Sequence, residues 1–120
     1  MEKLKYSIIY AVIRPEISEQ LSIGLIIVDG DKVEVLYSKN KLKAMQNLFS
    51  DKEYRFISGV VSSMKRGKTV ETVEDVNYLI RYSNNLIAVS PLQSIDISPT
   101  EQNKKWLLAN YVYNNKRQTA

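Results

Sequence analysis

The residues that most often carry catalysis and metal binding are missing from this chain of 120 residues. It has no histidine and no cysteine, so the commonest general base, the commonest transition-metal ligand and every thiolate site are excluded. Serine is abundant, but a serine nucleophile needs a base, which leaves only pairs such as Ser63 with Lys65 or Lys68. We interpret those as surface residues. Since phosphate-binding, dinucleotide and calcium loops are also missing, we expect no cofactor, no metal and a protein that is not an enzyme.

Basic side chains are the next candidates, and the chemistry they suggest is contact with phosphate. The chain carries 17 Lys and Arg against 13 Asp and Glu, a net charge of +4, while residues 69–98 are net acidic. This balance permits nucleic-acid binding without requiring it. Because the sequence does not place the basic segments on one face, we expect weak binding that disappears near physiological salt. The candidates are Lys39, Lys41, Lys43, Lys65, Arg66, Lys68, Lys104, Lys105, Lys116 and Arg117.

Aromatic side chains are the third set, and they favour contact with another protein. Eight tyrosines and one tryptophan occur in the chain. Tyrosine combines apolar area with a polar tip, which suits half-buried positions and interfaces. We select Tyr10, Trp106 and Tyr113 as candidate partner-binding residues; the alternative is that these side chains lie at the margin of the core.

A β-hairpin is the clearest element that could position these residues. Residues 22–28 are apolar on both faces, with Ile23, Leu25 and Ile27 on one of them, which is typical of a strand covered on both sides. An Asp-Gly turn follows, and residues 32–37 then alternate. Residues 6–13 form a third apolar strand. The sequence therefore predicts an antiparallel meander with the second strand in the middle.

Helices are predicted after this meander from local capping signals. A short apolar stripe begins near Leu42, and Ser50 with Glu53 has capping-box spacing. A weaker cap lies at residues 72–75, and Ser98 followed by Pro99 predicts the start of the last helix. A short strand is expected at residues 86–89, and residues 92–97 either extend it or re-enter the sheet. The predicted class is α+β: an antiparallel sheet, made of the three-stranded meander plus a short later strand, packed by about three to four helices.

The length is that of one domain, which we place at residues 1–114 with a polar tail at residues 115–120. No apolar run approaches the roughly 20 residues needed to span a bilayer. The basic N-terminus leads into a strand pattern and lacks a small-residue cleavage site. We expect a cytoplasmic protein with no membrane contact.

Two stretches resemble a known family. Residues 6–9, Pro15 and the strand at residues 21–28 resemble the opening of domain-of-unknown-function family 3037, and residues 86–99 resemble its later segment. This chain departs from the family pattern in having Tyr10 where many members carry arginine and Ser22 in place of asparagine. It also lacks the family's late histidine.

The resemblance implies a small bacterial protein without an established activity. Members of that family are often encoded beside HipA-like kinases, which implies a protein partner. Taken with the missing catalytic residues and the tyrosines, the leading hypothesis is a non-enzymatic accessory module that binds a protein, either a HipA-like kinase or a second copy of itself. The alternative is a nucleic-acid-binding accessory protein that uses its Lys and Arg patches, and an enzyme that works without histidine is the third hypothesis.

Overall fold

The computed structural model describes residues 4–14, 16, 19–67, 70–81 and 86–112. In this part of the chain, one antiparallel sheet of five strands packs with four α-helices, which confirms the predicted α+β class. The strands are β1 (Leu4–Arg14), β2 (Glu19–Asp29), β3 (Lys32–Tyr37), β4 (Ile87–Val89) and β5 (Gln93–Ile95). The helices are α1 (Lys39–Ala44), α2 (Asp51–Lys65), α3 (Val73–Arg81) and α4 (Glu101–Tyr111), and a 3-10 turn, η2, spans Gln46–Leu48.

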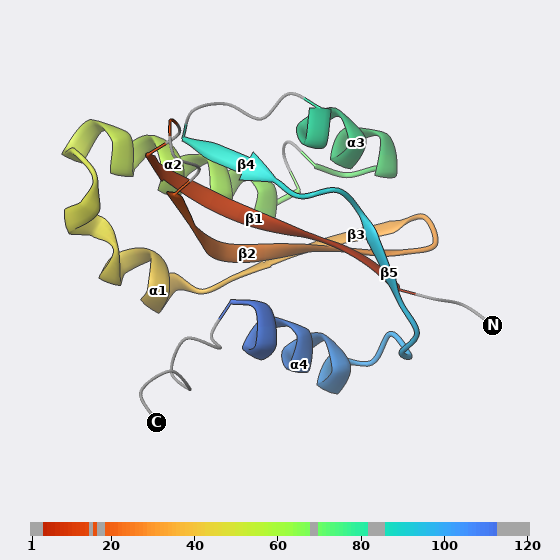
Figure 1. The fold of residues 1–120 in the computed structure, drawn as a ribbon. Helices are drawn as coiled ribbons and strands as arrows, with labels where there is room; N and C mark the ends of the chain where they lie inside the picture. Colours follow the sequence, from red (N-terminus) through yellow and green to blue (C-terminus); the bar gives the residue numbers. More distant parts are fainter. Residues whose placement is uncertain (1–3, 15, 17–18, 68–69, 82–85, 113–120) are drawn as a thin grey trace.

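The sheet has the order β3-β2-β1-β4, and β5 also pairs with β1. The predicted meander is confirmed, because β2 lies between β1 and β3. β4 pairs with residues 9–11 of β1 and β5 pairs with residues 4–6. Figure 1 shows these two short strands following one another along the same edge of β1. The chain therefore re-enters the sheet at β5, which is one of the two alternatives that the sequence left open for residues 92–97.

Ser90 connects the two short strands to the backbone of β1. Its hydroxyl accepts a hydrogen bond from the Ile8 N–H at 2.8 Å, and its own N–H donates to the Ile8 carbonyl at 3.0 Å. The side chain thus takes the place of a backbone acceptor at the point where β4 ends. The edge of β1 stays paired through a segment that contains Pro91.

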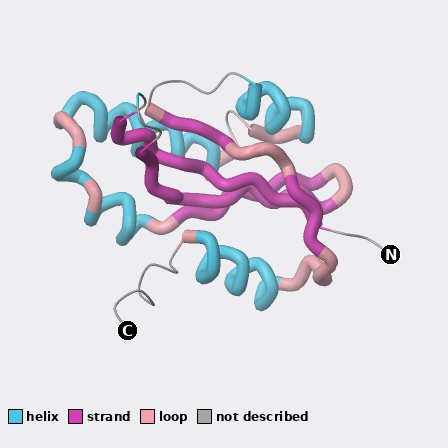
Figure 2. The backbone as a smooth tube through the Cα atoms, viewed as in Figure 1, coloured by secondary structure: helices cyan, strands magenta, loops and turns pink. Residues whose placement is uncertain are grey.

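The sheet lies between two helical layers, each with its own core (Figures 1 and 2). α1, α2 and α3 cover one face, where Leu42, Ile57 and Val76 pack against strand residues such as Ile26 and Val35. α4 covers the other face through buried contacts of Leu4, Tyr6, Leu25, Ile27, Leu107 and Val112. This explains why β2 is apolar on both faces, as the sequence indicated.

A β-bulge in β2 corrects the predicted face of Ile23. Ile9 pairs with Gly24 and Tyr10 pairs with Ser22, so Ile23 is the extra residue. It is fully buried in the core beneath α2, whereas Leu25 lies in the core beneath α4. The alternation that would have grouped the two side chains is interrupted by the bulge.

The caps of the helices agree with the sequence in two places and differ in one. Ser50 and Glu53 make both hydrogen bonds of the predicted capping box at α2. At α3, the Thr72 hydroxyl accepts from the Asp75 N–H at 3.2 Å. The prediction that Ser98 caps α4 is wrong, because Thr100 is the N-cap and accepts from the Asn103 N–H at 3.1 Å.

Two large apolar side chains in the helical part of the chain are exposed. Leu48 lies in η2, where the α-helical period ends, and is 53% exposed. Phe56 is 45% exposed, while Ile57 and Val61 of the same helix face the core. In the described residues, no helix is long and apolar enough to cross a membrane.

Candidate functional site

A basic groove lies where the end of β3 meets α1 and α2. It consists of two adjoining hollows of about 620 Å³ and about 580 Å³, which share Tyr37, Lys39 and Ser62. The first hollow runs between α1 and the N-terminal half of α2, and the second continues to the C-terminal end of α2 and to Leu108 of α4. Both are open depressions on the protein surface rather than enclosed cavities.

Five cationic side chains line this basic groove, and no carboxylate does among the described residues. The cations are Lys39 and Lys43 of α1, Arg55 and Lys65 of α2, and Arg66 just after α2. All five are exposed. None has an Asp or Glu partner within ion-pair distance in the described part of the chain. The groove therefore offers uncompensated positive charge to a ligand.

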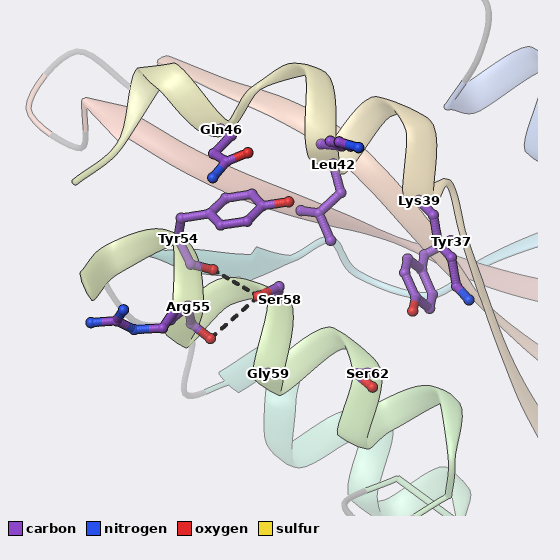
Figure 3. Close-up of a pocket in the computed structure, with 10 residues that line it drawn as sticks. Tyr37, Lys39, Leu42, Gln46, Tyr54, Arg55, Ser58, Gly59 and Ser62 are labelled. Atoms are coloured by element: carbon purple, nitrogen blue, oxygen red, sulfur yellow. Dashed lines mark hydrogen bonds between the residues drawn. The ribbon is translucent and has the colours of Figure 1, made fainter. Parts of the chain in front are cut away.

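Two tyrosine rings lie among these cations. Figure 3 shows the Tyr54 ring next to Gln46, with its hydroxyl pointing toward Leu42. The Tyr37 ring lies beside Lys39 at the other end of the same hollow (Figure 3). Both rings are half-buried and pack against the core beneath α2, so their positions are fixed by the fold. The groove thus combines charge with aromatic surface.

Local structure at the start of α1 brings its lysines over α2. Ser38 is fully buried, and its hydroxyl accepts from the Lys41 N–H at 3.0 Å as the N-cap of α1. Its own N–H donates to the Ile23 carbonyl in the bulge at 3.1 Å. Gly24 permits this close approach, since a Cβ there would lie only 2.7 Å from the Leu36 carbonyl oxygen. The bulge therefore determines where β3 ends and α1 begins.

Lys41 points away from the basic groove and holds the end of α4. Its ammonium donates to the Val112 carbonyl at 2.6 Å and lies 3.3 Å from the Ser22 hydroxyl, which itself donates to the Tyr111 carbonyl at 2.7 Å. Burial lowers the pKa of Lys41. A serine beside such a lysine has the residue types of a nucleophile and its base. Here both groups are engaged with the last carbonyls of the helix, so the pair has a structural role.

The other described basic residues selected from the sequence lie at separate places in the structure. Lys65 and Arg66 line the basic groove, and the Arg66 guanidinium donates to the Ser62 hydroxyl at 2.6 Å. Lys104 pairs with Glu34 at 2.8 Å on the opposite face of the sheet, and this hydrogen bond raises the pKa of Lys104. Lys105 is exposed on α4. Lys68, Lys116 and Arg117 lie outside the described residues.

Two of the three aromatic residues selected for partner binding lie in the described part of the chain. Tyr10 is half-buried on β1, and Trp106 is 50% exposed on α4. Tyr113 lies outside the described residues.

Arg55, Tyr54 and Gly59 are groove residues that the sequence did not single out. Each lies in α2 and lines the first hollow. The sequence pattern that could have identified them is their helical spacing, because residues three and four apart project from one side of a helix. That spacing also includes Ser58 and Ser62, so α2 presents a polar side toward α1. The location of α1 was needed to recognise this side as the wall of a groove.

Comparison of this chain with protein-family models, with curated proteins and with solved structures finds no match. The resemblance to family 3037 therefore stays a prediction.

Proposed function

We propose that this chain is a non-enzymatic accessory module of the bacterial cytoplasm that binds nucleic acid in the basic groove. The observation that supports this is the gathering of five exposed cations around two adjoining hollows with no carboxylate among the described lining residues. A nucleic-acid backbone presents regularly spaced negative charge, and a row of Lys and Arg binds it with release of counterions. The lack of histidine and cysteine supports a binding role rather than catalysis.

Weak nucleic-acid binding was expected because the sequence alone did not place the basic segments on one face. Lys39 and Lys43 lie in α1, whereas Lys65 and Arg66 lie at the far end of α2. These four cations share one face of the molecule because α1 folds back beside α2. Basic residues that gather on one face are the electrostatic footprint of nucleic-acid binding. We therefore place this alternative ahead of the protein-partner hypothesis.

Binding to a labelled oligonucleotide of random sequence, measured by fluorescence anisotropy over a range of salt concentrations, tests the proposal. We expect the logarithm of the association constant to fall linearly with the logarithm of salt concentration. The double variant Lys39→Ala, Lys43→Ala should bind more weakly and with a smaller slope. The matched control is Lys5→Ala, Lys32→Ala, because both lysines lie at the β2–β3 turn end of the sheet, far from the groove. Equal loss in the two double variants would contradict a role for the groove.

A second candidate is protein binding through α4, because Trp106 is half exposed on that helix. Exposed tryptophans act as anchors in many interfaces. The partner proposed from the family resemblance is a HipA-like kinase. Co-purification with a HipA-like kinase from the native host, lost in Trp106→Ala but kept in Lys39→Ala, Lys43→Ala, would support this candidate. Kinase binding that requires the groove lysines would contradict it.

A further inference from the structure

We propose, on the premise that the basic groove binds nucleic acid, that its ligand is single-stranded and that bases stack on Tyr54 and Tyr37. Positive charge alone does not distinguish a single strand from a duplex or from an acidic protein segment. The two tyrosine rings favour a single strand over a duplex, because the face of a base is free to stack on them when the base is unpaired. In a duplex the faces of the bases are already covered by their neighbours.

The backbone at each ring is held by the fold, and each ring packs against the core. Tyr54 lies in the first turns of α2, where its N–H donates to the Ser50 carbonyl at 2.9 Å and its carbonyl accepts from the Ser58 hydroxyl at 2.9 Å. Tyr37 is the last residue of β3 and pairs with Gly24. Each ring packs one side against the core beneath α2 and contributes to the lining of the hollow. A base that stacks there meets a preordered ring.

Cations lie along the whole groove, with the two rings among them. Tyr54 and Arg55 lie at one end, where the Arg55 side chain points away from the Tyr54 ring (Figure 3), Tyr37 lies beside Lys39 in the middle, and Lys65 and Arg66 lie at the other end. The stretch of α2 from Arg55 to Arg66 is about 16 Å long at ~1.5 Å per residue. At ~3.4 Å per stacked nucleotide, this length accommodates about five nucleotides. The groove therefore has room for a short strand with its phosphates on the cations.

The neutral lining residues favour a ligand of mixed sequence. Asn40 and Gln46 are exposed amides that can donate to or accept from many groups. The Ser58 hydroxyl is already engaged with the backbone of α2. Stacking is tolerant of base identity because every base has an aromatic face. We expect only a modest preference among bases.

The test compares a fluorescein-labelled single strand of about 12 nucleotides with a duplex of the same length, a size within the usual range for single-strand-binding modules. The full chain should bind the single strand more tightly. Tyr54→Leu should weaken single-strand binding by about 5- to 160-fold, the usual range for loss of one stacked base. Tyr54→Phe keeps the ring and should bind as the original protein does. Tyr78→Leu is the matched control, because Tyr78 is exposed on α3 and does not line the groove.

Gly59→Leu provides a variant that changes no charge. A Cβ at this position meets nothing within 4 Å, and Gly59 lies on the wall of the first hollow. The leucine should raise the stability of α2, since glycine is a poor helix former, and should also obstruct the strand. A raised melting temperature together with weakened single-strand binding is expected. Unchanged binding in this variant would overturn the location of the ligand beside Tyr54.

The remaining outcomes separate the two proposals. Equal or tighter binding of the duplex, with Tyr54→Leu binding like the original protein, would overturn the single-strand inference and leave the proposed function standing. Failure of both oligonucleotides to bind at low salt would overturn both proposals. Binding of poly-glutamate as tight as that of the single strand, and unaffected by Tyr54→Leu, would overturn the inference in favour of an acidic protein segment.

Discussion

Ser90 lies between β4 and β5, where its side chain replaces a backbone carbonyl as the hydrogen-bond acceptor for β1. Its hydroxyl takes the Ile8 N–H at 2.8 Å and so permits the strand edge to change partners without leaving a donor unpaired. Ser7 of β1 shows the contrasting case, because its hydroxyl is buried and has no hydrogen-bond partner among the described residues. The Ser90 hydroxyl therefore satisfies a backbone donor, whereas the Ser7 hydroxyl satisfies none among the described residues.

Replacing Ser90 with alanine should destabilise the protein by about 1 to 3 kcal/mol, because the Ile8 N–H would be left without its acceptor. Urea unfolding followed by circular dichroism measures this difference. Ser94→Ala is the matched control, since Ser94 is exposed on β5. Equal stability of the Ser90 and Ser94 variants would show that the hydrogen bond contributes nothing.

Tyr6 predicts a pH dependence of stability. Its ring stacks on Tyr111 with centroids 5.1 Å apart, and its hydroxyl lies 3.3 Å from the Tyr111 hydroxyl. This hydrogen bond, together with burial, raises the pKa of Tyr6 from 10.0 to about 12. A raised pKa in the folded state means that the stabilisation is fully present below pH 10 and is lost as the pH rises toward 12.

We therefore expect the free energy of unfolding to fall between pH 10 and pH 12 more steeply in the original protein than in Tyr6→Phe. Urea unfolding at several pH values within this window is the measurement. Parallel pH profiles for the two proteins would contradict the role given to the Tyr6 hydroxyl.

At the scale of elements, the start of α4 shows how two adjacent capping signals compete. The sequence around Ser98 and Pro99 has cap spacing, but Thr100 supplies the side chain that accepts from Asn103. The Ser98 carbonyl instead accepts from the Asn103 side chain at 2.8 Å. Both residues contact Asn103, yet only the hydroxyl of Thr100 satisfies a backbone N–H of the helix.

This arrangement predicts different effects for two similar substitutions. Thr100→Ala should cost about 1 kcal/mol of stability, because the Asn103 N–H loses its acceptor. Ser98→Ala keeps the backbone carbonyl and should change stability by less than the error of the measurement. Thermal unfolding of the two variants measures the difference in stability. A larger loss of stability in the Ser98 variant would show that Ser98 is the N-cap.

Elements with strong local signals could be predicted from the sequence, whereas features that depend on pairing could not. The Ser50 capping box and the Asp-Gly turn each lie within a few residues, and both elements formed as expected. The face of Ile23 was not predictable, because the bulge is defined only by the register against β1. The groove was hidden for a related reason: Lys39 and Arg66 become neighbours only when α1 folds back beside α2.

At the scale of the whole molecule, the sheet has a separate core on each of its two faces. β1 and β2 supply residues to both, including Ile9 and Ile26 on the α2 side and Leu25 and Ile27 on the α4 side. A defect on either face therefore acts on the same pair of strands. We expect the domain to unfold in a single cooperative transition.

Leu25→Asp tests this coupling, because it places a charge without a partner in the core beneath α4, where Leu25 is fully buried. We expect the loss of the whole fold, including the helices on the other face. Circular dichroism and amide hydrogen exchange report both faces at once. Gln20→Asp, at an exposed position of the same strand, is the control. Persistence of protected amides in α2 of the Leu25 variant would show that the two faces fold independently.

The pairing of β1 with β4 and β5 has a consequence for synthesis on the ribosome. β1 emerges before its partners, and β2 can pair with one side of it soon afterwards, but its other side waits for residues 87–95. Until then, a nascent chain presents an open strand edge flanked by apolar side chains. Open edges of this kind recruit strands from other chains. Slow translation across residues 38–86 should therefore favour aggregation, and fast translation or a chaperone that covers the β1 edge should prevent it.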